Sequence, residues 1–512
     1  MDRIFGIDLG TTNSVIAHTD ANGVTEVITG KDGGRIVPSV IYFPKNGDPV
    51  VGTNARQRTI TEPERIAKLF KRGMGERTFL PDEEPFIVDG KTWSPEELSS
   101  LVLRKLAQMA QERYGEPVRR AVITVPAYFG EAERAATQSA GELAGLEVLR
   151  ILSEPTAAAL AHGLDHPDEP GRILVFDLGG GTFDVTIMDV RADGAMEVVA
   201  TDGDRQLGGM DFDELVVQKM IKMASEAGLD IATEPWARQD AYLKAEEMKK
   251  ELSDLDTASR SLTGSGRPLQ FDLSRNEFEG LIKEKLREVE DTTLYMIENA
   301  GLQPSDLTMV LMVGGSSRIS AFQKLLAKVS GREPAFSRNL DEDVARGAAM
   351  LGAKLGGELD PRTQLAKIPP PVDMIAHGYG VSTLDMETSR MINSIIIPAQ
   401  TQIPIEPPGE ETFYTAEEGQ TQVDIMLNEG DGEDLDFVKL VAKGSGRFGR
   451  PVPRQHPVRI EVTFSDDQTV RLSAYDGESG AFLCKLEVER PGNLTKAERL
   501  KARESLSRMG VK

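Results

Sequence analysis

The chain contains almost no cysteine and little histidine. Cys484 is the only cysteine among 512 residues, which excludes an intrachain disulfide bond and a metal site built from cysteines. The five histidines are scattered and lack the spacing typical of metal ligands. A chain with a single cysteine is typical of a reducing compartment, so we predict a cytoplasmic protein.

Long apolar runs and an excess of basic charge are also missing. No run approaches the roughly 18 apolar residues of a membrane-spanning helix. The segment 1–5 lacks the charged and then apolar regions of a signal peptide. With 59 basic and 82 acidic residues the net charge is −23, which disfavours binding to nucleic acid or anionic lipid. We therefore expect neither a nucleic acid nor a membrane as a partner.

Two glycine-rich loops, far apart in the sequence, have the same design. Each follows a short apolar strand and leads into another, so each is expected at the tip of a β-hairpin. The loops read Asp8-Leu-Gly-Thr-Thr-Asn13 and Asp177-Leu-Gly-Gly-Gly-Thr-Phe-Asp184, with strands expected at 4–7, 15–17, 173–176 and 185–188. Because glycine has no Cβ, such loops can turn backbone N–H groups toward an anion, and the threonine hydroxyls add donors.

The aspartate at the head of each loop has a different role. A carboxylate repels phosphate, but it can hold a hydrated magnesium ion that bridges to phosphate oxygens. One such loop alone is more often a simple tight turn, whereas the pair predicts a grip on the phosphates of a nucleotide. Three further motifs appear in the order that such a site needs: Glu154-Pro-Thr-Ala-Ala-Ala159, Leu207-Gly-Gly-Met-Asp-Phe-Asp213 and Val313-Gly-Gly-Ser-Ser-Arg318.

Residues 1–358 alternate apolar strand segments with helical patterns, which predicts an α/β domain. A strand at 121–125 precedes a helix at 131–144, and a capping box at 94–97 opens a helix that ends near Gly115. Because the glycine-rich loops recur on both sides of a midpoint, we expect two related lobes that close on the nucleotide.

Three segments follow the α/β domain. Residues 359–374 are rich in proline, which predicts an extended interdomain linker without helix. Residues 375–490 contain short strand segments separated by Gly, Asp, Pro and Asn, which predicts a small all-β domain. Residues 491–512 have the pattern of one short, charged helix.

The two loops, together with Val122-Ile-Thr-Val-Pro-Ala-Tyr128 and Glu154-Pro-Thr-Ala-Ala-Ala-Leu160, closely resemble the DnaK-type heat-shock chaperones. The resemblance covers residues 1–357, continues more weakly through the β-domain and fails at the C-terminal end. It implies an actin-like, two-lobed ATPase domain followed by a β-sandwich that binds unfolded polypeptide segments. It also implies ATP or ADP with magnesium, and potassium as a candidate monovalent cation.

The same resemblance assigns the hydrolytic residues. It implies that Lys71 helps to position the γ-phosphate and the attacking water, that Thr182 contacts this phosphate, and that Glu154 and Asp184 lie near the attacking water. Asp8 and Asp177 would arrange magnesium through water. These residue types suit phosphoryl transfer to water, which needs charge stabilisation and positioning. Without the resemblance, Lys71 is better interpreted as a solvated surface charge and Glu154 as a carboxylate favoured by a helix dipole.

Nucleotide-binding residues follow by the same matching. The phosphate-binding set is Gly10, Thr11, Thr12, Asn13, Gly179, Gly180, Gly181, Thr182, Gly208 and Gly209. The adenosine-binding set is Glu246, Lys249, Lys250, Ser253, Gly315, Ser316, Arg318 and Asp341. The first four of these share one face of a predicted helix, as any amphipathic charged face would. Lys250 and Arg318 would sandwich the adenine.

Interdomain coupling and polypeptide binding are also implied by the resemblance. Pro126 and Arg134 match residues that signal between domains, and Arg150 matches an arginine used by J-domain partners. The alternative is a strand-end proline and two surface arginines. The polypeptide-binding set is Tyr379, Val381, Phe413, Ile425 and Leu427, with Leu427 at the central pocket position. Such alternating apolar residues are otherwise usually ordinary core.

The sequence departs from this family after the ATPase domain. The family's linker docks on the ATPase domain as an added strand. Here the linker carries a lysine and three prolines in 365–371, so the sequence leaves open whether it docks in this way. Only 22 residues follow position 490, too few for the family's helical lid, so we expect rapid exchange of bound polypeptide. Two other motifs are discounted: the GxGxxG pattern at 444–449 is predicted to be a flexible loop, and the acidic run 429–434 a solvated turn.

The sequence is compatible with three functions, which explain it to different degrees. The first is an ATP-dependent chaperone that hydrolyses ATP and binds unfolded polypeptide, with a J-domain co-chaperone and a nucleotide exchange factor as partners. The second is a nucleotide-gated adaptor or exchange factor with little coupled hydrolysis. The third, a small-molecule kinase or filament-forming relative, does not explain the β-domain.

Overall fold

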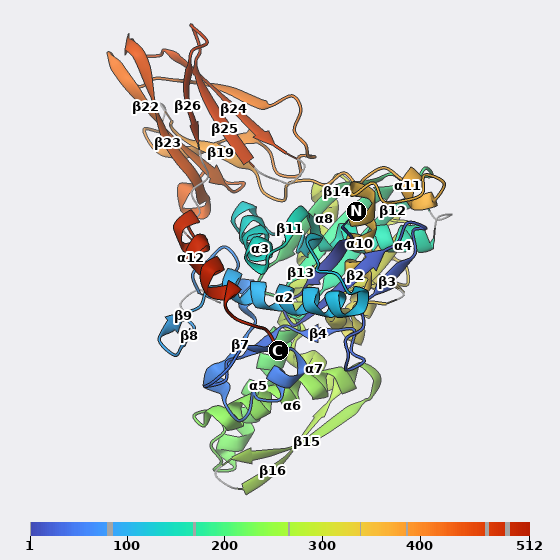
Figure 1. Ribbon diagram of the computed structural model, residues 1–512. Coiled ribbons are helices and arrows are strands. Elements are labelled where there is room, and N and C mark those ends of the chain that lie inside the picture. Colours follow the sequence, from blue (N-terminus) through green and yellow to red (C-terminus); the bar gives the residue numbers. More distant parts are fainter. Residues whose placement is uncertain are drawn as a thin grey trace. The chain divides into compact units, whose positions relative to one another are not determined.

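The computed structural model describes residues 2–78, 85–166, 170–264, 267–337, 339–385, 388–465, 470–486 and 492–512. They form two compact units (Figure 1). The first unit comprises 1–128, 136–371 and 496–512, and the second comprises 129–135 and 372–495.

Two β-sheets of similar construction form the centre of the first unit. One has the order β11-β10-β1-β2-β3 with β4 beside β2, and the other has the order β14-β13-β12-β17-β18. In each, an antiparallel hairpin lies beside a parallel strand: β1 pairs with β2 and β10, and β12 pairs with β13 and β17. The strands are β1 Ile4–Leu9, β2 Asn13–Thr19, β3 Thr25–Val27, β4 Val37–Pro38, β10 Arg120–Val125, β11 Glu147–Ser153, β12 Gly171–Leu178, β13 Phe183–Val190, β14 Met196–Asp204, β17 Met309–Val313 and β18 Ala335–Phe336.

Both predicted hairpins are confirmed. Leu9 pairs with Ser14 at the end of the first, and Leu178 pairs with Phe183 at the end of the second. The two glycine-rich loops therefore lie at equivalent positions of two related lobes. The α/β fold class expected from the sequence is correct.

Helix α10 (Asp343–Leu355) lies unusually close to both β1 and α4 (Glu154–Asp165). A Cβ on Gly6 would lie 2.0 Å from the backbone nitrogen of Ala349, and a Cβ on Gly347 would lie 1.8 Å from the carbonyl oxygen of Ala157. No side chain fits at either position, so glycine is required where the helix packs directly on backbone.

The remaining elements surround these sheets or extend from them. The small sheets contain β5 Val40–Tyr42, β6 Val50–Val51, β7 Ile66–Lys68, β8 Ile87–Val88, β9 Lys91–Thr92, β15 Thr257–Gly264 and β16 Arg267–Ser274. The helices are α1 Thr53–Arg56, η1 Pro63–Arg65, η2 Phe70–Gly73, α2 Pro95–Tyr114, α3 Glu131–Ala144, α5 Gly209–Glu226, α6 Pro235–Asp254, α7 Arg275–Leu281, α8 Lys283–Asn299, η3 Pro304–Asp306, η4 Gly315–Arg318 and α9 Ser320–Ser330. The predicted capping box opens α2, where the Ser94 hydroxyl accepts from Glu97 N at 3.2 Å and the Glu97 carboxylate accepts from Ser94 N at 3.1 Å.

The proline-rich segment after α10 contains a short helix, α11 (Gln364–Lys367), and the prediction of a helix-free linker is wrong here. Pro361 precedes the helix, and the run of three prolines begins at position 369, after the helix has ended, so no proline interrupts it. The Thr363 hydroxyl caps it by accepting from Ala366 N at 3.2 Å. Leu365 and Ile368 are 3% and 5% exposed, so this segment is packed into the first unit.

The last residues also belong to the first unit. Helix α12 (Lys496–Ser507) buries Leu506, and the Arg104 guanidinium donates to the Leu506 carbonyl at 2.7 Å. Lys512 then pairs with the edge of the small sheet that contains β6: Val51 N donates to Lys512 O at 2.9 Å, and Lys512 N donates to Pro49 O at 3.0 Å.

The second unit contains two antiparallel sheets with the orders β20-β19-β22-β23 and β21-β24-β25-β26. Side chains from both sheets form one core, as in a sandwich. The elements are β19 Tyr379–Leu384, β20 Met391–Ile397, β21 Gly409–Tyr414, β22 Gln420–Glu429, η5 Leu435–Phe437, β23 Lys439–Val452, β24 Pro457–Phe464, β25 Val470–Asp476 and β26 Phe482–Leu486. The predicted small all-β domain is compatible with this arrangement.

Two expectations for this unit are wrong. The glycine-rich segment 444–449 is part of strand β23 and pairs with β22. Its glycines also let β26 pack closely, since a Cβ on Gly446 would lie 2.8 Å from Leu483 Cβ. Glu429, expected in a solvated turn, ends β22 and is 6% exposed.

Among the described residues, no helix is long and apolar enough to cross a membrane.

Replacement of Gly347 should destabilise the first unit. We expect Gly347→Ala to lower the free energy of unfolding by roughly 2–3 kcal/mol, because the added methyl group would overlap the Ala157 carbonyl. Chemical denaturation measures the change. The control is Gly280→Ala in α7, where a Cβ meets no atom within 4 Å, and it should be neutral or stabilising. Equal destabilisation by both variants would contradict the proposed packing.

Candidate functional site

The tips of the two glycine-rich loops touch each other. A Cβ on Gly180 would lie 2.4 Å from Thr12 Cγ2, and a Cβ on Gly181 would lie 2.4 Å from Thr11 Cγ2. The second loop is closed by a hydrogen bond from Gly179 N to Thr182 O at 3.0 Å. The structure therefore brings together the two halves of the predicted phosphate-binding set.

The loop that precedes α5 joins the second glycine-rich loop through its backbone. Gly209 N donates to Gly179 O at 3.0 Å, and Met210 N donates to Gly180 O at 2.9 Å. A Cβ on Gly208 would lie 2.6 Å from the nitrogen of Gly181. The loop before α5 and the second glycine-rich loop are thus joined through backbone atoms, and the side chains of Thr11 and Thr12 bring the first loop to the same place. Only glycine permits such close approach at positions 180, 181 and 208.

Lys71 is buried and paired with Glu154. The lysine is on the 3₁₀ turn η2, after Leu69 in the left-handed region with φ 64°. Glu154 is the first residue of α4, and the next residue, Pro155, favours the start of this helix. Lys71 Nζ lies 2.6 Å from Glu154 Oε1, and the lysine is 3% exposed. Lys71 is therefore not the solvated surface charge that its sequence context alone suggests.

Three aspartates lie close to this ion pair. Burial, followed by the charge of Glu154, raises the pKa of Asp8 from 3.8 to about 7. Burial, then Glu154 and then Asp184, raises the pKa of Asp177 well above its ordinary value. Asp184 is 1% exposed and accepts a hydrogen bond from Tyr128 N at 2.9 Å.

Four carboxylates thus lie near a single ammonium group, and burial, followed by the charge of Glu154, raises the pKa values of Asp8 and Asp177 although Lys71 lowers them. A divalent cation would compensate the negative charge, because Asp and Glu oxygens are the ligands that magnesium prefers, directly or through water. The described residues contain no group of three or more side chains placed to ligate a metal directly. These carboxylates therefore fit a hydrated magnesium ion better than one held entirely by protein ligands.

The predicted adenosine residues occupy two neighbouring groups. Lys249 is buried and donates to Gly209 O at 2.6 Å and to Asp213 Oδ2 at 2.8 Å, so it supports the loop before α5. Burial raises the pKa of Asp213 to about 6 although Lys249 lowers it. Ser316 belongs to the same group, since its hydroxyl would lie 2.4 Å from a Cβ on Gly209.

The other adenosine residues are more exposed. Lys250 pairs with Glu246 at 2.6 Å, and its side chain is 61% exposed. Arg318 pairs with Asp341 at 3.2 Å, and its side chain is 54% exposed. A Cβ on Gly315 would lie 3.5 Å from Asp341 Oδ1. Ser253 Oγ turns back to its own helix and donates to Lys249 O at 3.4 Å.

Three basic residues were missed by the sequence analysis. Arg56 pairs with Glu246 at 2.5 Å, Lys68 donates to Gln239 at 2.8 Å, and Arg72 donates to Gly181 O at 2.8 Å. These contacts join α1 and β7 to α6, and η2 to the second glycine-rich loop. The only sequence signal for Arg72 is its position beside Lys71, because its acceptors lie more than 100 residues further along the chain.

The predicted coupling residues differ in burial. Pro126 is buried after β10, and Arg150 is half-buried in β11. Arg134 is 5% exposed, and its Nε donates to Phe129 O at 3.0 Å, both within the second unit.

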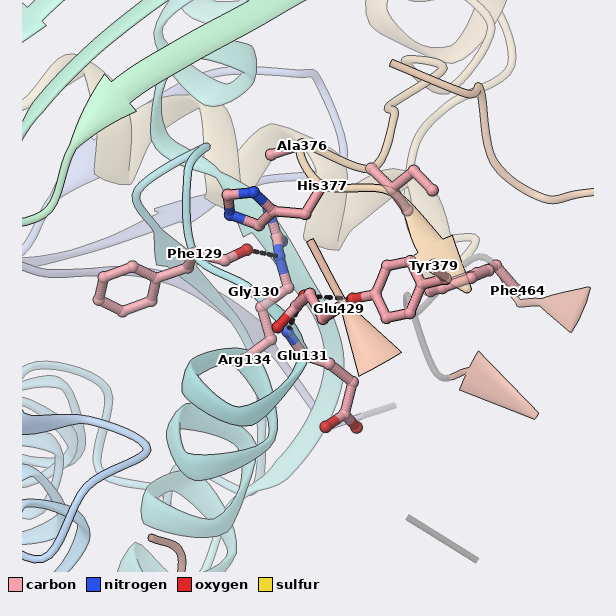
Figure 2. A pocket seen from close by; sticks show the side chains of 10 residues that line it. Phe129, Gly130, Glu131, Arg134, Ala376, His377, Tyr379, Glu429 and Phe464 are labelled. Carbon is pink, nitrogen blue, oxygen red and sulfur yellow. Dashed lines mark hydrogen bonds between the residues drawn. The ribbon is translucent and has the colours of Figure 1, made fainter. Parts of the chain in front are cut away.

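The second unit contains a cavity of about 10 Å³, lined by Arg134, Tyr379 and Glu429 among others (Figure 2). The Glu429 carboxylate accepts from the Tyr379 hydroxyl and from Glu131 N, the latter at 3.1 Å. Burial and then the charge of Glu429 raise the pKa of Tyr379 well above its ordinary value, so the phenol stays protonated and donates. The cavity has room for about one water molecule and is too small for a ligand.

Four of the five predicted polypeptide-binding residues lie in the core of the sandwich. Tyr379, Val381, Ile425 and Leu427 are at most 3% exposed. Phe413 is partly exposed and packs against the same core. Their assignment to a polypeptide groove remains a prediction.

Comparison with known proteins decides the family. A family model described as Hsp70 protein matches residues 4–499. The chain belongs to the Hsp70 family. It is similar to Chaperone protein DnaK of Thermotoga neapolitana, with 38% identity over 494 residues that cover 93% of this chain and 79% of the relative. It is also similar to Chaperone protein DnaK of Ureaplasma parvum, with 40% identity over 473 residues that cover 91% of this chain and 74% of the relative.

Membership in this family makes the chain an ATP-dependent chaperone and an ATPase with an actin-like ATP-binding domain. The resemblance that the sequence motifs suggested is confirmed. The assignment of the two touching glycine-rich loops to the nucleotide phosphates remains a prediction.

The raised pKa of Asp8 predicts a pH-dependent stability of the nucleotide-free protein. Because its pKa is about 7 in the folded protein and 3.8 ordinarily, folding favours the protonated form. This stabilisation is full below pH 3.8 and is lost as the pH rises through about 7. We expect Asp8→Asn to raise the free energy of unfolding at about pH 8 by on the order of 3 kcal/mol, and by much less near pH 4.

Denaturation at a series of pH values measures this difference. Asp291→Asn, at an exposed position of α8, is the control and should not change the pH dependence. If the free energy of unfolding of Asp8→Asn equals that of the wild-type protein at every pH, then folding does not disfavour the ionised form of Asp8.

Proposed function

We propose that this Hsp70 chain hydrolyses ATP with Lys71, Glu154, Thr182 and Asp184 and uses the cycle to control polypeptide binding by its β-domain. The observation that carries the proposal is the buried Lys71–Glu154 ion pair, which lies among carboxylates at the heads of two touching glycine-rich loops. This arrangement supports the proposal, because a fixed positive charge and several carboxylate oxygens lie close to the loops that would bind the phosphates.

The glycine-rich loops would bind the phosphates through backbone N–H groups. Their glycines leave no side chain between the backbone and an anion, and Thr11, Thr12 and Thr182 add hydroxyl donors. The residues proposed to bind phosphate are Gly10, Thr11, Thr12, Asn13, Gly179, Gly180, Gly181, Thr182, Gly208 and Gly209. Backbone donors held in this way need little reorganisation when charge develops on the phosphate oxygens.

Asp8 and Asp177 would hold magnesium through water, and a monovalent cation such as potassium would lie nearby. When bound, magnesium supplies positive charge that compensates the phosphate oxygens. The raised pKa values of both aspartates support this assignment, because each carboxylate is more stable ionised when a cation is near.

Lys71, Glu154 and Asp184 would act on the attacking water and the γ-phosphate. The ammonium of Lys71 is held at 2.6 Å by Glu154, so its position is fixed before substrate arrives. The carboxylate of Asp184 is held by Tyr128 N and can accept a hydrogen bond from water. Positioning of this kind contributes most of the catalysis in phosphoryl transfer, where covalent help is small.

The exposed charges on α6 and η4 would bind adenosine. Lys250 and Arg318 are exposed enough to stack on the two faces of the adenine. Gly315 and Asp341 lie beside Arg318, whereas Lys249 and Ser316 support the loop before α5. The full proposed set is Glu246, Lys249, Lys250, Ser253, Gly315, Ser316, Arg318 and Asp341.

The β-domain would bind unfolded polypeptide at Tyr379, Val381, Phe413, Ile425 and Leu427. Because all but Phe413 are buried, an extended peptide would need a movement of the sandwich edge to reach them. Pro126 and Arg134 would transmit the nucleotide state, and Arg150 would bind a J-domain partner. A nucleotide exchange factor and a cytoplasmic location complete the proposal.

Single-turnover hydrolysis of ATP, with and without an unfolded polypeptide, tests this function. The wild-type chain should hydrolyse ATP, and the polypeptide should increase the rate. Lys71→Ala should reduce the rate by roughly 100-fold or more, because a fixed charge at the γ-phosphate is lost. Lys328→Ala is the control, because the side chain of this lysine on α9 is 74% exposed. This variant should hydrolyse ATP at the wild-type rate.

A variant Lys71→Ala with the wild-type rate would contradict the catalytic assignment. Hydrolysis that depends on Lys71 but ignores the polypeptide would support a nucleotide-gated adaptor and contradict the coupling.

A further inference from the structure

Arg72 connects the turn that carries Lys71 to the second glycine-rich loop. Its Nε donates to Gly181 O at 2.8 Å. Its two terminal nitrogens donate to the Asp211 carboxylate, with Nη1 at 3.2 Å from Oδ1 and Nη2 at 2.5 Å from Oδ2. The side chain is 3% exposed. A guanidinium in this fork geometry fixes the direction of its acceptors as well as their distance.

Asp211 extends the connection to the third loop. The Oδ2 atom that accepts from Arg72 also accepts from Gly208 N at 2.7 Å. Gly208 packs directly on Gly181, and the next two residues donate to the carbonyls of Gly179 and Gly180. One guanidinium therefore contacts both loops that the second lobe contributes to the phosphate site.

The contact with Gly181 O also sets the direction of a neighbouring donor. In a trans peptide the carbonyl oxygen and the following N–H point in opposite directions. Since Arg72 holds the carbonyl of Gly181, the N–H of Thr182 must point away from Arg72. Thr182 is the residue of this loop that is proposed to contact the γ-phosphate.

Lys71 and Arg72 are consecutive on η2 and contact different partners. Lys71 pairs with Glu154 in the first lobe's catalytic group, whereas Arg72 holds the two loops of the second lobe. The short turn keeps these two contacts at a fixed separation, because one backbone segment of Phe70–Gly73 carries both.

We propose that Arg72 is a positioning residue for ATP hydrolysis, which sets the Lys71 ammonium relative to the Thr182 loop. It acts through Gly181 and Asp211 and need not touch the nucleotide. The inference rests on the proposed hydrolytic function of Lys71 and Thr182, and it adds a residue whose role is geometric: a lysine would keep the charge at position 72 but could not hold both acceptors.

Four full-length variants test this proposal: Arg72→Ala, Arg72→Lys, and the controls Arg58→Ala and Arg58→Lys. Arg58 is an exposed arginine of the same lobe. Single-turnover hydrolysis at saturating ATP gives the rate constant of the chemical step, and titration calorimetry gives the ATP affinity. We expect both Arg72 variants to lose roughly 10- to 100-fold in rate constant while the Kd for ATP changes by less than about threefold. The Arg58 variants should match the wild type.

Chemical rescue separates positioning from folding. Free guanidinium at millimolar concentration should restore part of the rate of Arg72→Ala, because it can refill the fork between Gly181 and Asp211, and it should not help Arg72→Lys. A role limited to stability would show no rescue. If Arg72→Ala does not fold, Arg72→Lys carries the comparison.

Three results, besides an absence of rescue, would overturn the proposal. These are wild-type rate constants in both Arg72 variants, full activity of Arg72→Lys, which would reduce the role to charge alone, and a loss confined to ATP affinity. The wild-type protein and Lys71→Ala are measured beside them. A wild type without Lys71-dependent hydrolysis would instead reject the proposed function itself.

Discussion

The contact between the two glycine-rich loops is the constraint on which the rest of the site depends. Thr11 and Thr12 fill the space that a Cβ at Gly181 or Gly180 would need, so the two hairpins can meet only if both positions lack a side chain. The related construction of the two sheets presents these hairpins at equivalent positions. The turn η2 and the loop before α5 are joined to the second glycine-rich loop by hydrogen bonds, and α6 is joined in turn to the loop before α5. A nucleotide that binds there would bind both lobes at once.

Uncompensated negative charge is the second property of this site. Lys71 offsets part of the charge of Glu154, Asp8 and Asp177, and burial raises the pKa values of both aspartates. Such a group is costly without a cation, because buried carboxylates lose their hydration. We propose that magnesium and nucleotide compensate this charge when they bind.

Local patterns in the sequence were enough to predict some elements but not their partners. The two hairpins and the start of α2 follow from short-range alternation, glycine and capping, and the structure agrees. The burial of Lys71 depends on Glu154, 83 residues away, and no local pattern contains that contact. The errors have the same origin. The glycines at 444–449 resemble a loop, but they are needed for close strand packing, and the helix at 364–367 is stabilised by burial of Leu365 against distant residues.

The most direct test of this account is the affinity of Gly180→Ala for ATP, measured by titration calorimetry beside Gly280→Ala. The added methyl group at position 180 would overlap Thr12 at 2.4 Å and separate the loops, whereas position 280 has no atom within 4 Å. We expect Gly180→Ala to remain folded but to bind ATP about 10- to 100-fold more weakly, and Gly280→Ala to bind ATP as the wild type does. Equal affinity of the two folded variants would show that the contact between the loops does not form the nucleotide site.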